Sequence, residues 1–335
     1  MTRVGIAGAG WAGSVHAAAL SLTTGAHLVQ VLSRTAAGAD RIAGPSQVPG
    51  GTYAEISSKL NAIVVASPAE HHSETALEGI GRGLAVLIEK PLALNLAECD
   101  EIIAAAEAAG VVCGLAENLL FAPAVKVGLA HRRTLGPLTR LSVRFRSDAP
   151  SWGHFLEPLP GGGVLHDLGA HPIALILAFA GSEPTSVTAS VLHRRPDLAD
   201  DEVALSVTFA SGLVADIEVS WRAADIEWDL ELAADDGVVR LEWFPNVTVE
   251  CDGIDRTPAL TRSDLDDPRL ESFGYLAQTQ GFVDVLAGRG GRVCPLGFGR
   301  LVQEITTAAY DSAEHDGRAV ALPYQGPRDE NPPAA

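Results

Sequence analysis

The sequence is short of cationic, aromatic and cysteine residues, and these shortages exclude several classes of protein. Lysine and arginine together number 24, against 42 aspartate and glutamate residues, which gives a formal net charge of −18. A chain this acidic is poorly suited to bind nucleic acid or an anionic membrane surface, because the phosphates would repel it. No apolar run in the sequence is long enough to span a bilayer. We therefore expect no nucleic-acid partner and no membrane partner.

Cysteine is rare, and no two cysteines have the spacing of a zinc site or a redox pair. The four are Cys99, Cys113, Cys251 and Cys294. We expect neither a metal site nor a disulfide, in keeping with a reducing compartment. The first residues, Met1-Thr2-Arg3-Val4, run directly into a strand-like pattern without the apolar stretch of a signal peptide. These features predict a cytoplasmic protein.

The chain opens with a strand-like run, Val4–Ala7, a glycine-rich loop and a helical pattern. This is GxGxxG in the context that dinucleotide binding requires, with a strand before it and a helix after it. The first glycine permits the tight turn, the second lets the backbone approach a pyrophosphate, and the third lets helix pack on strand. A glycine-rich turn that binds nothing is the alternative. The predicted cofactor contacts of this loop are Gly8, Gly10, Trp11, Ala12 and Gly13.

The end of the second predicted strand, Leu28–Leu32, bears on the choice of cofactor. An acidic residue at this position would bind the ribose hydroxyls of NAD. The chain instead has Ser33, Arg34 and Thr35, and a guanidinium flanked by hydroxyls suits a 2′-phosphate. We therefore predict NADP in preference to NAD. If Arg34 only stacks on the adenine, the protein would accept both cofactors.

Further buried-type strands, Ala62–Ala66, Ala85–Ile88 and Val111–Gly114, alternate with helical patterns. This alternation predicts an α/β Rossmann domain with a parallel, doubly wound sheet. Proline restricts the residue before it, so Lys90 of Glu89-Lys90-Pro91 is held at the carboxyl end of a strand, where such sheets bind ligands. A lone lysine in this place could also be an ordinary surface residue. Predicted cofactor contacts along this edge are Ser67, Pro68, His72, Glu89, Lys90 and Asn118.

The pattern changes near residue 120. Strand candidates and tight turns dominate Thr185–Glu250 and predict an α+β domain with a large open antiparallel sheet. We predict a dinucleotide-binding domain over 1–120, a domain for substrate binding and oligomerisation over 121–324, and a flexible tail over 325–335.

Asp167 and His171 are four residues apart, so on one helix they would share a face. An imidazole beside a carboxylate can transfer protons, but a capping aspartate and a hydrogen-bonded histidine would give the same spacing. His166 is a rival imidazole. The candidate substrate contacts, chosen because they occur in loops, are Trp152, His154 and Arg222.

Two spaced motifs carry a family resemblance. The first is Ser67-Pro68-Ala69-Glu70-His71-His72, followed after a helix by a strand that ends in Glu89-Lys90-Pro91. The second is Gly161-Gly162-Gly163 followed by Asp167 and His171. In this order they resemble the signatures of the Gfo/Idh/MocA oxidoreductases, the relatives of glucose–fructose oxidoreductase and inositol dehydrogenase. The resemblance implies that Lys90 lies beside the nicotinamide and the reacting hydroxyl, and that Asp167 and His171 complete a catalytic trio.

The resemblance also implies a homodimer or homotetramer formed through the C-terminal sheet, with Val219, Trp221 and Leu232 as apolar residues available for the contact. The chain departs from the family at Ala174, where many members carry an acid.

These observations predict an NAD(P)-dependent oxidoreductase. It would move a hydride between nicotinamide and a hydroxyl or keto carbon of a sugar, cyclitol or amino-sugar-like substrate. His171 would serve as the base, Asp167 would tune it, and Lys90 would polarise the reacting oxygen. Two alternatives stay open: a cofactor-retaining enzyme that uses transient oxidation for elimination, hydrolysis or epimerisation, and a non-catalytic nucleotide-binding sensor.

Overall fold

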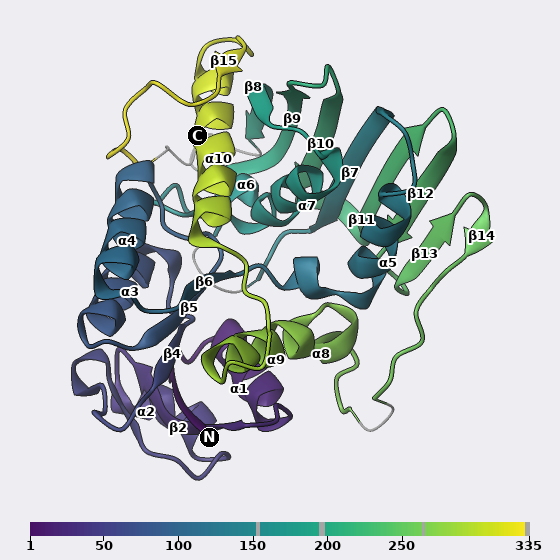
Figure 1. Ribbon diagram of the computed structural model, residues 1–335. Helices are drawn as coiled ribbons and strands as arrows, with labels where there is room; N and C mark the ends of the chain where they lie inside the picture. Colours follow the sequence, from purple (N-terminus) through teal and green to yellow (C-terminus); the bar gives the residue numbers. More distant parts are fainter. Residues whose placement is uncertain (152–154, 194–197, 263–264, 332–335) are drawn as a thin grey trace. The chain divides into compact units, whose positions relative to one another are not determined.

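The structure, a computed structural model, describes residues 1–151, 155–193, 198–262 and 265–331 (Figure 1). The chain forms two compact units. The first contains Met1–Ala122 and Arg262–Arg300, and the second contains Pro123–Thr261 and Leu301–Ala335. The sequence predicted two domains that follow one another along the chain, and it did not predict that residues 262–300 return to the first unit. The functional division of the chain and the flexible tail stay predictions.

The first unit is built on a parallel sheet with the strand order β3-β2-β1-β4-β5-β6. Its strands are β1 (Thr2–Ala7), β2 (Ala26–Ser33), β3 (Gly50–Thr52), β4 (Ala62–Val65), β5 (Ala85–Glu89) and β6 (Cys113–Ala116). The chain winds outward from β1 through β2 and β3, then returns to place β4 on the other side of β1. That reversal is the topological switch point at which such sheets bind ligands.

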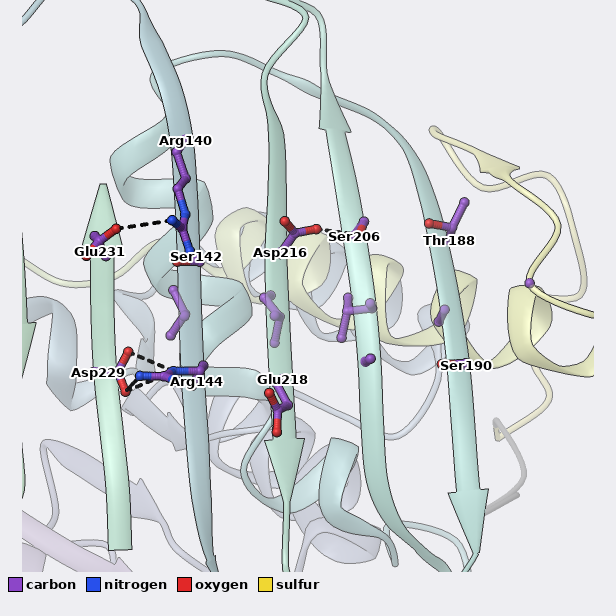
Figure 2. A pocket seen from close by; sticks show the side chains of 16 residues that line it. Arg140, Ser142, Arg144, Thr188, Ser190, Ser206, Asp216, Glu218, Asp229 and Glu231 are labelled. Atoms are coloured by element: carbon purple, nitrogen blue, oxygen red, sulfur yellow. Dashed lines mark hydrogen bonds and ion pairs between the residues drawn. The ribbon is translucent and has the colours of Figure 1, made fainter. Parts of the chain in front are cut away.

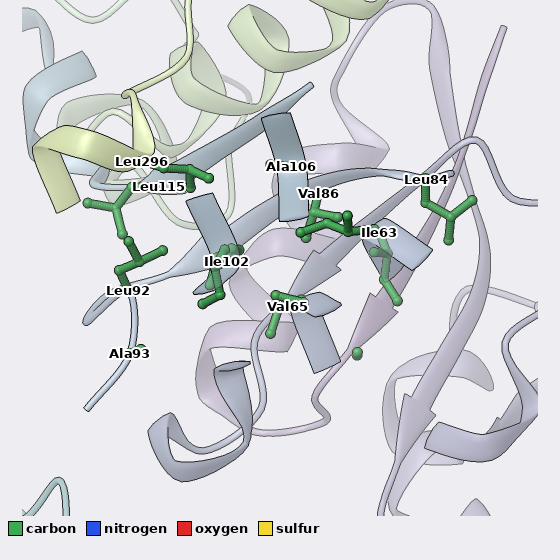
Figure 3. Close-up of a cluster of buried hydrophobic side chains, with 14 of the residues drawn as sticks. Ile63, Val65, Leu84, Val86, Leu92, Ala93, Ile102, Ala106, Leu115 and Leu296 are labelled. Atoms are coloured by element: carbon green, nitrogen blue, oxygen red, sulfur yellow. The ribbon is translucent and has the colours of Figure 1, made fainter. Parts of the chain in front are cut away.

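Helices cover both faces of this sheet. They are α1 (Trp11–Ser21), α2 (Ala36–Ala43), α3 (His72–Gly81), α4 (Leu96–Ala109), α8 (Arg269–Ser272) and α9 (Tyr275–Leu286), with the 3-10 turns η1 (Tyr53–Glu55), η2 (Ala69–His71) and η3 (Asn118–Phe121). Ile63 and Val65 of β4 pack in a cluster with α3 and α4 (Figure 3). Val64, between them, packs with Leu20 of α1 and Phe282 of α9 on the opposite face. The strands are thus buried on both sides, as their unbroken apolar runs predict.

The second unit contains a mixed sheet in the order β14-β13-β12-β11-β7-β10-β9-β8-β15. Its strands are β7 (Leu138–Asp148), β8 (Pro184–His193), β9 (Asp200–Phe209), β10 (Val214–Ser220), β11 (Arg222–Ala234), β12 (Gly237–Glu242), β13 (Thr248–Cys251), β14 (Ile254–Asp255) and β15 (Val320–Ala321). Antiparallel hairpins dominate, but β7 and β10 pair in parallel. The predicted fold class, a Rossmann unit plus an α+β unit with a large sheet, is confirmed.

Helices α5 (Pro123–Arg132), α6 (Val164–Asp167) and α7 (Ala170–Ala180) contact this sheet, and α10 (Leu296–Glu314) follows later in the chain. Val219, Trp221 and Leu232 are at most 1% exposed. The sequence had suggested them for a subunit contact, and that was wrong because all three are buried: Val219 and Leu232 at inward-facing positions of β10 and β11, and Trp221 between the two strands.

The polar positions form a charged face on the second unit's sheet. Figure 2 shows Arg140 and Arg144 of β7 beside Glu231 and Asp229 of β11. On the other side, Asp216 of β10 accepts a hydrogen bond from the Ser206 hydroxyl of β9 at 2.6 Å. Among the described residues, no helix combines the length and the apolarity needed to cross a bilayer.

Candidate active site

The glycine-rich loop joins β1 to α1 through two close backbone approaches. A Cβ on Gly8, where φ is 134°, would lie 2.0 Å from the Ala66 carbonyl oxygen, and one on Gly13 would lie 2.1 Å from that of Gly8. Any side chain at either position would collide with backbone. Gly10 is exposed, and a Cβ there would meet nothing within 4 Å. The loop is therefore closed where it packs and open at its middle glycine.

The start of α1 has the chemistry of an anion site. Among the residues that the structure describes, no side chain caps the helix at Gly10, and its first turn carries no acidic residue. The first N–H groups and the helix dipole are thus available for a phosphate. Trp11 is 61% exposed, and its ring meets that of Tyr275 edge-on, with centroids 6.3 Å apart. A dinucleotide pyrophosphate fits this loop, with the free backbone N–H groups as its donors.

Polar residues at the end of β2 lie on the surface, beside the start of α2. The Thr35 hydroxyl oxygen caps α2 by accepting a hydrogen bond from the Gly38 N–H at 3.1 Å, which leaves the hydroxyl proton free to donate. Arg34 is exposed. Burial raises the pKa of Tyr53, while the positive charge of Arg34 opposes the shift. The charge of the guanidinium therefore also reaches η1, the 3-10 turn after β3.

Lys90 follows β5 directly, in a cis peptide bond with Pro91, and is half-buried. The preceding residue, Glu89, accepts a 2.8 Å hydrogen bond from Nε2 of His16 on α1. Burial would raise the pKa of Glu89, but the hydrogen bond from His16 and the charges of His16, Lys90 and His72 outweigh it and lower that pKa. A buried carboxylate thus joins the first helix to the turn that carries Lys90.

His72 is 2% exposed, and both of its ring nitrogens face backbone carbonyl oxygens. Nδ1 lies 2.7 Å from the oxygen of Pro91, and Nε2 lies 2.9 Å from that of Ser67. Asn118 is also buried and donates through Nδ2 to the Phe273 carbonyl oxygen at 2.8 Å. These two predicted cofactor contacts therefore hold the loops of the sheet edge. Ser67 and Pro68 form the turn that His72 fixes, and the Ser67 Oγ is buried without a hydrogen-bond partner among the described residues.

In the second unit, Asp167 and His171 are not on one continuous helix, as their spacing had suggested. Asp167 is the last residue of α6 and His171 the second residue of α7. Pro172 explains the break, because it has no N–H to donate and its ring crowds the carbonyl four residues earlier. The Leu168 carbonyl oxygen accepts from the His171 N–H instead, at 3.3 Å.

His171 is 7% exposed and lies among aromatic rings. Its ring centroid is 6.4 Å from those of Phe145 and Trp228, which stack on one another at 4.3 Å. Asp167 is half-buried. Ala174 is fully buried, so the acid that many relatives carry there would need a partner in an apolar setting.

The remaining predicted site residues lie elsewhere or outside the described residues. Arg222 begins β11 and forms a 3.3 Å ion pair with Glu202. Trp152 and His154 are outside the described residues. His166, the rival imidazole, is 3% exposed and contacts the Gly162 carbonyl oxygen through Nδ1 at 3.0 Å. In the part of the chain that the structure describes, no histidine, cysteine or carboxylate cluster could hold a metal ion.

Sequence reasoning missed three buried polar residues that support these positions, namely His16, Asp200 and Tyr310. The histidine in a helix that follows a glycine loop, and the doublet Asp200-Asp201 at the start of an apolar strand, were the available signals. Tyr310, within an ordinary helical pattern, gave none.

Comparisons with known proteins place the chain in a family. Residues 2–117 match the model described as "Oxidoreductase family, NAD-binding Rossmann fold", and residues 129–240 match the "GFO/IDH/MocA C-terminal domain". Inositol 2-dehydrogenase of Rhizobium meliloti is 29% identical over 76% of this chain and 81% of its own length. Scyllo-inositol 2-dehydrogenase (NADP(+)) IolU of Bacillus subtilis is 33% identical over 39% of this chain and 42% of its own length.

Among solved structures, GenD2 from gentamicin A biosynthesis, in complex with NAD, superposes with a TM-score of 0.83, at 27% identity over 96% of both chains. Other curated relatives align over less of their length: 40% of an uncharacterized Saccharomyces cerevisiae protein, and 57% of a Sus scrofa dihydrobenzenediol dehydrogenase. The two matching models define an oxidoreductase class with an NAD-binding Rossmann fold. The chain belongs to the Gfo/Idh/MocA oxidoreductase family. The predicted family, enzyme class and type of cofactor are thereby confirmed.

Proposed function

We propose that this protein is an NAD(P)-dependent oxidoreductase that moves a hydride between nicotinamide and a hydroxyl or keto carbon of a sugar, cyclitol or amino-sugar-like substrate. The observation that carries the proposal is the 2.8 Å hydrogen bond between His16 and Glu89. It connects the helix after the dinucleotide loop to the residue before Lys90. The loop that would hold the cofactor and the turn that holds Lys90 are therefore connected through this hydrogen bond.

The family relationship supports the roles of the other two residues. In the oxidation direction His171 takes the proton of the substrate hydroxyl, and Asp167 orients the imidazole and stabilises its charge. Lys90 donates to the same oxygen and stabilises its negative charge as the proton leaves. The cofactor, when bound, supplies the hydride acceptor. In reduction the same side chains return the proton to the oxygen.

NADP is the proposed cofactor, with NAD as the alternative. Arg34 is exposed at the end of β2, and the Thr35 hydroxyl keeps its proton after capping α2. A guanidinium and a hydroxyl donor together suit a 2′-phosphate. Trp228, which is half-buried beside His171, supports a substrate with apolar C–H faces between its hydroxyls.

A cytoplasmic location and a homodimer or homotetramer complete the proposal. The charged face on the second unit's sheet, rather than an apolar patch, would form the subunit contact.

The test is turnover of purified protein with NADPH or NADP and a panel of sugars, cyclitols and their keto forms. We expect substrate-dependent absorbance change, and a loss of about a hundredfold or more in kcat/KM for Lys90→Ala and His171→Ala. Unchanged turnover in both variants would refute the assigned roles. A cofactor that copurifies and cycles without net change, with product formed, would favour transient oxidation. Ligand binding without turnover would favour the sensor.

A further inference from the structure

A chain of hydrogen bonds in the second unit ends on a buried carboxylate. Asp200, the first residue of β9, is 0% exposed. Its Oδ2 accepts from the Leu165 N–H at 3.0 Å, and its Oδ1 accepts from the Tyr310 hydroxyl at 2.9 Å. Leu165 is in α6, so a side chain 35 residues later in the sequence caps that helix.

The approach of this carboxylate requires a glycine in the loop before α6. At Gly163 φ is 92°, and a Cβ there would lie 1.9 Å from Oδ1 of Asp200. No other residue could occupy the position without displacing the carboxylate. The third residue of the glycine triplet is therefore required locally, because only glycine leaves room for the Asp200 carboxylate.

His166 extends the chain of hydrogen bonds. Its Nδ1 faces the Gly162 carbonyl oxygen at 3.0 Å, and a carbonyl only accepts, so Nδ1 carries the proton. The Tyr310 hydroxyl oxygen lies 3.2 Å from the same nitrogen and can accept from it while donating to Asp200. The two rings also stack, with centroids 5.1 Å apart. Each bond of such a series polarises the next.

Helix α6, which these bonds hold, is too short to be stable without them. Helix α6 has four residues, about one turn, and a single turn in isolation is unstable because its nucleation cost is not recovered. Asp200 fixes its start and His166 lies within it. Asp167 is its final residue, so the direction of the Asp167 carboxylate depends on these external bonds.

We propose that Asp200, Tyr310 and His166 are positioning residues that set the orientation of Asp167 for the reaction. This rests on the proposed function, because it assumes that Asp167 acts with His171. The network does not touch the substrate. It acts through the backbone of α6, and its loss should lower kcat without changing cofactor binding.

Tyr310→Phe is the primary variant, because it keeps the stacked ring and removes only the hydroxyl. Tyr324→Phe is the matched control: the Tyr324 hydroxyl also bonds to a carboxylate in the second unit, that of Asp311. We expect kcat to fall about tenfold or more in Tyr310→Phe and to stay within about twofold in Tyr324→Phe. NADPH affinity, followed by tryptophan fluorescence, should be the same in both. Equal loss of kcat in the two variants would overturn the proposal.

Amide hydrogen exchange provides a readout that does not depend on activity. In Tyr310→Phe the Leu165 amide should exchange at least about tenfold faster than in the unaltered protein, while the Ile173 amide, bonded to Gly169 within α7, should not change. If the unaltered protein turns over nothing in the panel, the proposed function fails and the exchange data still decide whether the network holds α6. Unchanged exchange at Leu165 overturns the proposal even if activity falls.

Two further substitutions keep the test decisive if Tyr310→Phe does not fold. His166→Asn retains a donor near the position of Nδ1, whereas His166→Leu removes it. We expect the asparagine variant to keep a larger share of kcat than the leucine variant at equal thermal stability. Equal activity of these two variants would also count against the positioning role.

Discussion

The imidazole of His72 and the backbone carbonyl oxygen of Pro91 are 2.7 Å apart. Because the other ring nitrogen lies 2.9 Å from the Ser67 carbonyl oxygen, one side chain joins the turns that follow β4 and β5. This gives a physical reason for the pairing of Ser-Pro…His with Glu-Lys-Pro in one chain. The histidine of the first motif fixes the backbone beside the lysine of the second.

Removing this brace should cost both stability and activity. We expect His72→Leu to lower the free energy of unfolding by about 2–4 kcal/mol, because one of the two buried carbonyl oxygens loses the N–H of the neutral ring and the cavity is refilled imperfectly. Turnover should fall with it, since Lys90 loses a fixed neighbour. Urea unfolding followed by circular dichroism measures the first effect. His71→Leu, at the half-buried neighbouring residue, is the control and should change neither quantity.

The stability of the fold should decline in mild acid. Burial lowers the pKa of His166 to about 4, from an ordinary value of 6.5, and burial also lowers the pKa of His72. Between about pH 6.5 and pH 4, His166 is protonated in the unfolded chain but not in the folded chain, so the free energy of unfolding falls as the pH falls. For His166 the full effect is about 3 kcal/mol. The lowered pKa of Glu89 adds a further loss below its ordinary value of 4.5.

The measurement is urea unfolding over a series from about pH 7.5 to 4.5, comparing the unaltered protein with His166→Asn. The net charge of −18 shrinks in acid and relieves repulsion, which partly offsets the loss. The difference in slope between the two proteins is therefore the decisive quantity. The slope should be shallower in His166→Asn than in the unaltered protein, and substitution of the exposed His27 by asparagine is the control. Parallel slopes for all three proteins would contradict the assigned burial of His166.

The main features of the fold followed from local patterns, whereas its supporting contacts did not. The unbroken apolar runs around Ile63 and Val86 predicted a parallel sheet, and Asn95 and Gly110 cap α4 at the predicted ends. The sequence predicted a cofactor contact for His72 but not its contacts with the Ser67 and Pro91 carbonyl oxygens. A motif shows which residues occur together, but it does not show which of their atoms meet. Helices α8 and α9 were not predicted at all, since their packing on the first unit depends on a return of the chain that no local pattern encodes.

The site shows the same division. The spacing of Asp167 and His171 made both residues candidates, a role that stays a prediction, but it suggested one helix where Pro172 imposes two. The burial of Asp200 depends on an approach to Gly163 across 37 positions, and only a three-dimensional structure shows such a contact.

Arg34 should determine the choice between NADP and NAD. Replacement by alanine removes the cation offered to a 2′-phosphate, so we expect NADPH affinity to fall about ten- to a hundredfold and NADH affinity to change little. Isothermal titration with both cofactors measures the two constants in one preparation, and NADH serves as the internal control. Equal weakening of both would indicate that Arg34 stacks on the adenine instead.

The charged face on the second unit's sheet should control self-association. Arg144 lies 3.0 Å from Asp229, and carboxylates on the neighbouring strand β10, such as Glu218, lower its local potential further. Arg144→Glu would place a further carboxylate among them, and a dimer formed through this face should weaken by about tenfold or more, because like charges would be pressed together. Sedimentation velocity at low and high salt measures the change, which added salt should reduce. Arg269→Glu, an exposed and paired arginine of the first unit, is the matched control. A monomeric unaltered protein, or a dimer indifferent to Arg144→Glu, would exclude this face as the contact.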